Sequence, residues 1–205
     1  MSFWDERYDR PDYVFGEAPN AFLAAQQSRL SGYRTALAVA DGEGRNGVWL
    51  AEQGLEVLAI DASAIGLEKA RRLAEKRGVT LATRQLDIAL YDWPAERFDV
   101  IAAIFIQFAP PALRDAIFAG MARALAPGGL LLVQGYRPEQ LAYGTGGPAQ
   151  VENLYTEPLL RSSFAALDII HLGVHDSVLT EGAAHSGPSA LIDLVARKPK
   201  GASQP

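Results

Sequence analysis

Short apolar runs alternate with longer stretches of helical period along the chain, a pattern typical of βα units around a parallel sheet. Most of the runs are too continuously apolar for a sheet with one solvated face, so we expect those to be buried on both faces. The predicted strands of this part are 37–40, 56–61, 80–86, 98–105 and 130–135. The helices predicted between them are 45–53, 64–77 and 111–125, and Gly54 and Gly78 stand at the expected C-cap positions.

The pattern changes after Gly135. A loop rich in glycine and proline (136–152) precedes a short helix (156–164) and two strands, 168–179 and 189–197. The connection 180–188 is too short for a parallel crossover, so these strands should pair antiparallel, with their turn at the carboxyl end of the sheet. The prediction is an α/β, Rossmann-like, doubly wound sheet of seven strands, mostly parallel with an antiparallel last strand. Residues 1–198 should form a single domain, with 1–29 as an N-terminal helix and lid region and 199–205 as a disordered tail.

Composition narrows the function classes. A chain of 205 residues with 49% apolar content can bury one core. Its formal charge of −5 and pI near 5.2 disfavour a polyphosphate partner. The absence of cysteine excludes thiolate metal sites and a cysteine nucleophile. The N-terminus lacks the basic and apolar regions of a signal peptide, and the apolar run 100–106 is too short to span a membrane, so we expect a cytoplasmic protein without a membrane partner.

A glycine-rich loop, 41–47, follows the first predicted strand and matches G-x-G-x-x-G at Gly42, Gly44 and Gly47. Asp41 and Glu43 would place carboxylates beside a pyrophosphate, which opposes dinucleotide binding. S-adenosylmethionine, with a sulfonium, an ammonium and one carboxylate, suits a loop that offers both amides and acidic side chains. The alternative is a tight turn without a ligand.

Acidic residues also follow the next two strands. Asp61 at the tip of the second strand can accept both hydroxyls of a ribose; alternatively it caps the following helix, a role that Ser63 could take instead. Asp87, after the third strand, can accept from an adenine amino group while Ile88 packs on the ring, although a strand-end polar residue without a ligand is a comparable interpretation.

These motifs together resemble the class I S-adenosylmethionine-dependent methyltransferases, in particular the small bacterial group related to tellurite-resistance and thiopurine methyltransferases. The resemblance covers nearly the whole chain. The motifs that carry it are residues 41–46 with 49–51, 60–63, 98–100 and 125–129, and, more specific to a subgroup, 4–8, 13–16, 19–20, 139–148, 181–182 and 185. One departure is that Ala38 and Ala40 stand where the family has an acidic residue and a glycine; Asp41 can replace the missing charge.

The resemblance implies a methyltransferase with S-adenosylmethionine as cofactor and a small-molecule acceptor, possibly a thiol or chalcogen oxyanion. The alternatives are a nonenzymatic S-adenosylmethionine-binding protein and an NAD(P)-dependent oxidoreductase. Nucleic acid is disfavoured because residues 105–111 lack the Asn/Asp-Pro-Pro-Tyr/Phe motif of amino-methylating enzymes. The expected cofactor-binding residues are Phe15, Asp41, Gly42, Gly44, Asn46, Asp61, Ala62, Asp87, Ile88 and Ile104.

The acceptor side is predicted from topology. His185 in the last turn and Tyr143 after the fifth strand should both reach the carboxyl end of the sheet, where a histidine near its ordinary pKa can take a proton and a tyrosine can orient the acceptor. The alternative for His185 is an exposed hairpin residue. Gln107 and Phe108 are further candidates for this pocket. We expect no metal site, because the histidines are not accompanied by carboxylates at ligand spacing.

The N-terminal aromatic residues Trp4, Tyr8, Tyr13 and Phe15 are too many for a free tail. Two interpretations remain open for them: a lid over the methyl donor, or a patch that packs against the core from outside.

Overall fold

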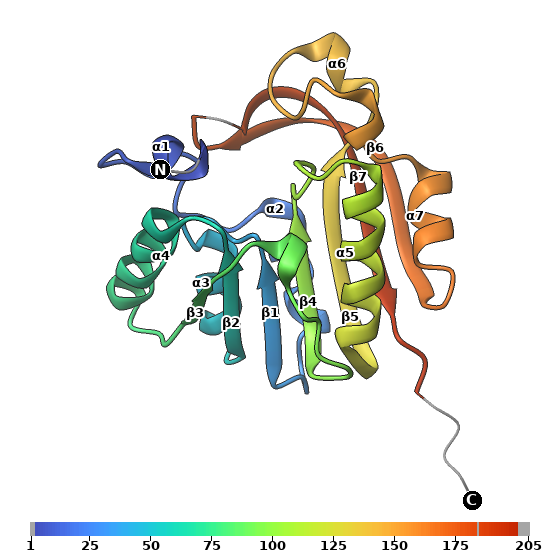
Figure 1. The fold of residues 1–205 in the computed structure, drawn as a ribbon, viewed down its shortest axis with the longest axis horizontal. Coiled ribbons are helices and arrows are strands. Elements are labelled where there is room, and N and C mark those ends of the chain that lie inside the picture. The colour runs from blue at the N-terminus through green and yellow to red at the C-terminus, as the bar shows by residue number, and fades with distance from the viewer. Residues whose placement is uncertain (1–2, 184, 201–205) are drawn as a thin grey trace, which may run out of the picture.

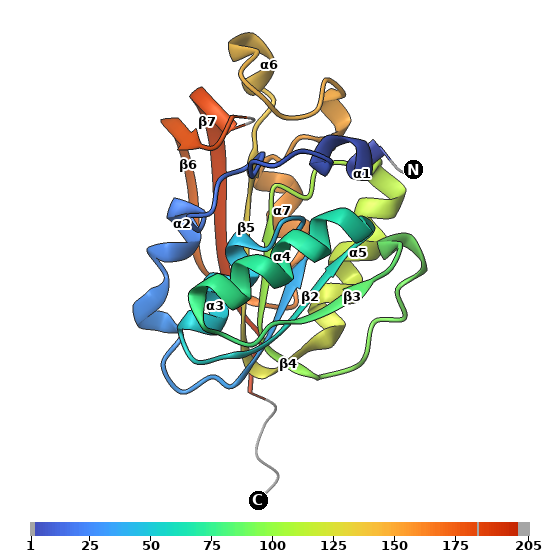
Figure 2. The same cartoon turned by 90° about the vertical axis from the view of Figure 1, so that its left-hand side faces the viewer.

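The computed structural model describes residues 3–183 and 185–200. A seven-stranded sheet with strand order β3-β2-β1-β4-β5-β7-β6 carries helices on both faces (Figures 1 and 2). The strands are β1 (Thr35–Val39), β2 (Glu56–Asp61), β3 (Ala82–Gln85), β4 (Phe98–Ile104), β5 (Leu125–Tyr136), β6 (Asp168–Glu181) and β7 (His185–Arg197). The α-helices are α1 (Phe3–Tyr8), α2 (Ala21–Ala24), α3 (Arg45–Glu52), α4 (Ala64–Arg77), α5 (Pro111–Ala124), α6 (Gln140–Tyr143) and α7 (Glu157–Ser163). Short 3₁₀ turns lie at η1 (Gln27–Arg29), η2 (Ile88–Leu90) and η3 (Val151–Asn153).

The sheet confirms the predicted topology. Strands β1 to β5 pair in parallel with their neighbours, and β7 is antiparallel to both β5 and β6. Both faces are covered. Leu37 and Ile101 pack in a cluster that includes residues of α5 and α7. Ala38 and Val100 belong to a second cluster with residues of α2 and α3. Burial on both faces is why these strands have no polar alternation.

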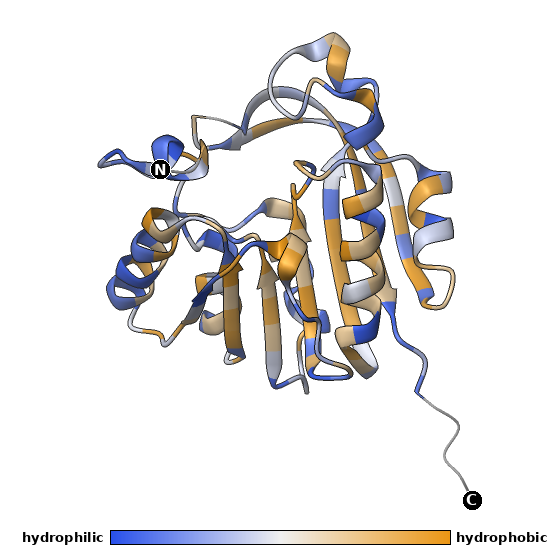
Figure 3. Cartoon of the chain, viewed as in Figure 1, coloured by the Kyte–Doolittle hydropathy of each residue, from blue (hydrophilic) through white to orange (hydrophobic). Residues whose placement is uncertain are grey.

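Helix α4 begins and ends where its sequence predicts. The Ser63 hydroxyl accepts a hydrogen bond from the Gly66 amide, and Gly78 at φ +68° takes the left-handed C-cap conformation. Leu67, Leu73 and their apolar neighbours are buried, whereas the opposite face is hydrophilic (Figure 3). The periodicity and the two caps together determine the helix.

The C-terminal ribbon is longer than predicted. The stretch 180–188 is not a loop, because β6 continues to Glu181 and β7 begins at His185. Pairing of β7 with β5 ends at Tyr136↔Leu191, so Pro188 lies where β6 is the paired neighbour of β7. A proline is tolerated there because its missing amide is not needed for a central ladder. The overhanging ribbon arches over the carboxyl end of the sheet (Figure 1).

Two other local predictions are corrected. The helix expected in the N-terminal region 1–29 is divided into α1, α2 and η1, and of α2 and η1 only Phe22 and Leu23 are buried. The loop 136–152 contains the short helix α6 and part of η3. Residues 201–205 of the expected disordered tail lie outside the described residues. Within the described part of the chain, no helix is long and apolar enough to cross a membrane.

Candidate functional site

A cavity of about 660 Å³ lies at the carboxyl end of the sheet. Residues at or just after the ends of β1, β2, β3 and β4 line it, which is where ligands bind in open α/β sheets. Its other walls come from α1, from the loop after α6 and from the start of β7. The topology therefore gathers residues from both ends of the chain around one space.

Most of the expected cofactor-binding residues meet at this cavity. The lining includes Phe15, Asp41, Asn46, Asp61, Ala62, Asp87, Ile88 and Ile104. Gly42 and Gly44 are not part of the lining, and their role in cofactor binding stays a prediction. The Gly42 amide donates to Asp61 Oδ2 at 2.8 Å, and a Cβ on Gly44 would lie 2.5 Å from the Cβ of Ala70. These glycines shape the loop and let α3 and α4 approach each other.

Glu43 faces away from the cavity. Its Oε1 lies 2.5 Å from Lys69 Nζ in a buried ion pair, and its Oε2 accepts from the Phe15 amide at 3.3 Å. Lys69 Nζ also donates to the carbonyls of Tyr8, Arg10 and Asp12. The acidic residue that the sequence suggested for the ligand thus fastens the N-terminal segment to α4.

Asp41 lines the cavity beside the start of α3. Its carboxylate accepts from the Gly47 amide at 3.1 Å. Burial raises the pKa of Asp41 to about 7, and the nearby Asp61 carboxylate adds to the rise, although the Gly47 amide opposes it. A cationic group placed beside Asp41 would favour the ionised form.

Asp61 ends β2 with its carboxylate held in a fixed orientation. Its oxygens accept from the amides of Gly42 and Ser63, each at 2.8 Å. Ser63, not Asp61, provides the side-chain cap of α4. Burial raises the pKa of Asp61, while these amides lower it. Each carboxylate oxygen has a further lone pair available for a ligand hydroxyl.

Asp87 serves a local role and also lines the cavity. It caps η2 by accepting from the Ala89 amide at 2.9 Å, and the buried Ile88 beside it contributes apolar surface. Asp87 is therefore a strand-end polar group that also lines the cavity, and its contact with an adenine ring stays a prediction.

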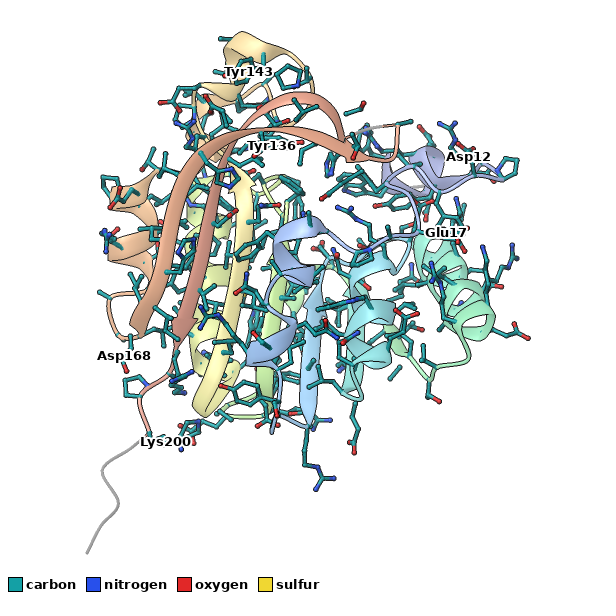
Figure 4. The ribbon with its side chains drawn as sticks, turned by 180° about the vertical axis from the view of Figure 1, so that it is seen from behind. Asp12, Glu17, Tyr136, Tyr143, Asp168 and Lys200 are labelled. Carbon is teal, nitrogen blue, oxygen red and sulfur yellow. The ribbon has the colours of Figure 1, made fainter. Side chains whose placement is uncertain are left out.

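His185 lines the cavity, but Tyr143 does not. The His185 ring lies 4.6 Å from the Phe15 ring and 4.4 Å from the Phe105 ring, between centroids. Tyr143 is 39% exposed and donates to Asp176 Oδ2 at 3.1 Å, so its placement in the same pocket is corrected. Figure 4 shows Tyr143 on α6, farther from the sheet than Tyr136. The residues of that loop that line the cavity are Gly146, Gly147, Pro148 and Gln150.

The expectation that His185 keeps an ordinary pKa is also corrected. Burial, with the Arg45 and Arg7 guanidiniums, lowers the pKa of His185 to about 3. The imidazole is therefore neutral at physiological pH and is a poor proton acceptor in the free protein. Arg45 forms a buried ion pair with Glu181 at 2.7 Å, and Arg7 lies over the rings of Trp4 and Phe15.

Both further candidates for the acceptor side line the cavity. Gln107 is buried, and its amide is fully used by Tyr136 and by the Asn153 carbonyl, so it acts as a structural bridge. Phe108 is 38% exposed and thus not part of the core. Nothing in the sequence indicated that Arg45 and Tyr136 line the cavity. Arg7 lines it as well, and the only indication for it was that it lies among the N-terminal aromatic residues.

Two non-glycine residues of the cavity wall adopt left-handed backbone conformations. Ala40 has φ +49° and Phe105 has φ +56°. Such conformations cost free energy and concentrate at functional sites. Ala40 holds the position where the family resemblance expects a glycine, so the backbone shape of that motif is retained without its usual residue.

The N-terminal segment contributes aromatic residues both to the cavity wall and to the packing of the protein body. Trp4, Tyr8 and Phe15 line the cavity, and Tyr8 is also buried against the body of the protein. The Tyr13 hydroxyl donates to the Lys69 carbonyl at 3.0 Å. The segment is anchored on α4 and covers the cavity at the same time.

Comparisons with known proteins agree with this geometry. Residues 36–129 match the sequence model of a methyltransferase domain. A search among curated proteins gives no match. Similar solved structures include a protein described for the conversion of a disulfide bond into a thioacetal group during echinomycin biosynthesis. The two share 19% identity, the TM-score is 0.76, and 98% of this chain and 92% of that chain are covered.

Two further structures share the fold. TehB from Haemophilus influenzae is 15% identical with a TM-score of 0.72, covering 96% of this chain and 66% of that one. The N-methyltransferase NodS from Bradyrhizobium japonicum, in complex with S-adenosyl-l-homocysteine, is 17% identical with a TM-score of 0.70, and 96% of each chain is covered.

The matched methyltransferase domain, the strand order and the cavity at the carboxyl end of the sheet show the fold of the class I S-adenosylmethionine-dependent methyltransferases. The chain resembles TehB and NodS in this fold.

Proposed function

We propose that the protein is an S-adenosylmethionine-dependent methyltransferase and that it methylates a small, soft, negatively charged acceptor, such as a thiolate or a chalcogen oxyanion. The division of charge in the cavity wall carries this proposal. The carboxylates of the lining, Asp41, Asp61 and Asp87, all follow β1, β2 and β3. The guanidiniums of Arg7 and Arg45 also line the cavity and lower the pKa of His185, and Arg45 is paired with Glu181.

The acidic side of the cavity fits the methyl donor. Asp61 is positioned for the ribose hydroxyls, Ile88 and Asp87 for the adenine, and Asp41 for the methionine ammonium. Asn46, Ala62 and Ile104 complete this wall, and Phe15 lies above it. When bound, the donor supplies a methyl group on a positively charged sulfur, and the protein's residues must align and shield it.

The basic side fits an acceptor that arrives as an anion. Arg7 attracts negative charge, and the neutral His185 imidazole and the surrounding rings exclude water. Such an acceptor needs no general base, so alignment is the main contribution of the protein. A cationic amine would be repelled by the Arg7 guanidinium, whereas the charge of Arg45 is compensated by Glu181.

The enclosed cavity and the formal charge of −5 favour a small molecule over nucleic acid as the substrate. We place the protein in the cytoplasm, in keeping with its lack of cysteine. Residues 1–198 serve as one catalytic domain in this proposal, and the region 1–29 contributes the segment that covers the donor.

The test is release of S-adenosylhomocysteine from S-adenosylmethionine in the presence of thiols, selenite, tellurite, halides and, as a contrasting class, primary amines. We expect turnover with at least one anionic acceptor, and no turnover with the amines. Turnover confined to amines would overturn the proposed acceptor class. Donor binding without turnover on any acceptor would favour a nonenzymatic S-adenosylmethionine-binding protein.

A further inference from the structure

Two cavity-lining residues carry a buried polar atom without a hydrogen-bond partner. Within the described part of the chain, Tyr136 Oη and His185 Nδ1 have no such partner, and Tyr136 is only 1% exposed. An unpaired buried polar group is destabilising, so such groups in native proteins call for an explanation. Tyr155 Oη is unpartnered as well, but Tyr155 does not line the cavity.

Aromatic rings hold this pair in place. The centroids of the Tyr136 and His185 rings are 5.9 Å apart. Phe105 contacts both of them, with centroid distances of 4.4 Å to His185 and 4.7 Å to Tyr136. The left-handed backbone of Phe105 puts its ring in this position. Gly147 lets the loop after α6 lie on the Tyr136 ring, because a Cβ there would be 2.8 Å from Tyr136 Cδ2.

Both groups of the pair are uncharged at physiological pH. Burial raises the pKa of Tyr136 far above its ordinary value, and Glu181 contributes to the rise. The hydroxyl therefore keeps its proton and can donate it in a hydrogen bond. His185 is neutral because of burial and the nearby guanidiniums. In a pocket of low polarity, hydrogen bonds from such groups are stronger than in water.

We propose that Tyr136 Oη and His185 Nδ1 form the subsite that binds the negatively charged group of the methyl acceptor. Tyr136 donates a hydrogen bond to that group, and His185 orients it through Nδ1. No proton passes from the acceptor to either residue. This inference rests on the proposed function and adds to it the residues that select the acceptor.

The competing occupant of this pair is the carboxylate of the methyl donor. The experiment therefore measures donor binding separately from acceptor use. Calorimetry gives the dissociation constant of S-adenosylhomocysteine, and steady-state assays give kcat/KM with selenite and with a benzenethiol. Tyr136→Phe is the main variant, and removal of an unpartnered hydroxyl should leave the melting temperature equal or higher.

Tyr155→Phe is the matched control, since it removes an equally buried, unpartnered hydroxyl outside the cavity. We expect Tyr136→Phe to lower kcat/KM by about tenfold or more, as for loss of a hydrogen bond to a charged group. Its S-adenosylhomocysteine affinity should stay within about twofold of the wild type. Tyr155→Phe should match the wild type in both measurements. His185→Asn should retain more activity than His185→Gln, because the asparagine amide lies closer to the position of Nδ1.

Unchanged kcat/KM in Tyr136→Phe would overturn the inference, as would a tenfold loss of S-adenosylhomocysteine affinity, which would assign the pair to the donor. If the wild type turns over no acceptor of the panel, the proposed function fails separately. The pair is then tested by ¹⁵N-histidine NMR on the S-adenosylhomocysteine complex, to which selenite is added. A change at His185 Nδ1 in the wild type that is weakened in Tyr136→Phe supports the subsite. No change in the wild type contradicts it.

Discussion

Lys69 Nζ lies 2.5 Å from Glu43 Oε1 beneath the N-terminal segment, and both side chains are buried. The same ammonium binds three backbone carbonyls of that segment. The pair therefore joins the glycine-rich loop, α4 and the cover of the cavity into one unit. Removal of one partner of a buried ion pair leaves an uncompensated charge, which is more harmful than loss of both.

Lys69→Met should lower the free energy of unfolding by about 3 kcal/mol and weaken donor binding. Lys76→Met is the matched control on the same helix. Lys76 pairs with Glu17 at 2.6 Å, but its side chain is 62% exposed, so we expect a loss below about 1 kcal/mol. Urea unfolding and calorimetry with S-adenosylhomocysteine measure both effects. If Glu43→Gln combined with Lys69→Met is no more stable than Lys69→Met alone, the ion pair is not the cause.

Asp41 should couple donor binding to pH. Its pKa is about 7 in the free protein, and a bound cationic ammonium would lower it. Binding should therefore release a proton below about pH 7, and affinity should rise with pH until it levels off above that value. Calorimetry in buffers of different ionisation enthalpy measures the released protons. Asp41→Asn should abolish this release, whereas Asp87→Asn should retain it; equal release in wild type and Asp41→Asn would assign the proton elsewhere.

His185 should make the folded protein sensitive to acid. Its pKa is about 3 when folded and near 6.5 in the unfolded chain, so the unfolded state binds more protons between these values. Its stabilising contribution is complete above about pH 6.5 and is lost progressively as pH falls toward about 3. Urea unfolding at about pH 4.5 and about pH 7 should show about 2 kcal/mol less acid loss in His185→Asn than in the wild type. His171→Gln, on the exposed part of β6, should behave as the wild type.

The sequence predicts a helix or strand well where a regular hydrophobic pattern is combined with a capping or turn residue at the end of the element. Ser63 and Gly78 fix the ends of α4, and the apolar runs fix β1, β2 and β4. The predicted connection 180–188 is too long, because Gly187 and Pro188 are typical turn residues. In the structure both belong to the paired ribbon of β6 and β7. The strand ends still indicated Asp61 and Asp87, because topology alone brings them to one edge of the sheet.

The direction of a side chain was harder to predict. Glu43 resembled a ligand-facing acid, yet it turns to Lys69, which lies 26 residues further along the chain and outside any local motif. Tyr143 and Tyr136 both fall in the predicted loop 136–152, but in the structure Tyr143 is exposed, whereas Tyr136 ends β5 and is buried. Its unpartnered hydroxyl becomes visible only when the neighbours from the other strands are in place.

The central claim is that S-adenosylmethionine binds at the strand ends with its ribose on Asp61. The most direct measurement is the calorimetric titration of S-adenosylmethionine into the wild type, Asp61→Ala and Asp99→Ala. Asp99 is a matched control at the amino end of the sheet, away from the cavity. Like Asp61, it accepts hydrogen bonds from two backbone amides, those of Arg34 and Thr35 at the start of β1.

We predict one site in the wild type, more than about tenfold weaker binding in folded Asp61→Ala, and wild-type affinity in Asp99→Ala. An unchanged dissociation constant in folded Asp61→Ala, or a wild type that does not bind S-adenosylmethionine, would contradict the account.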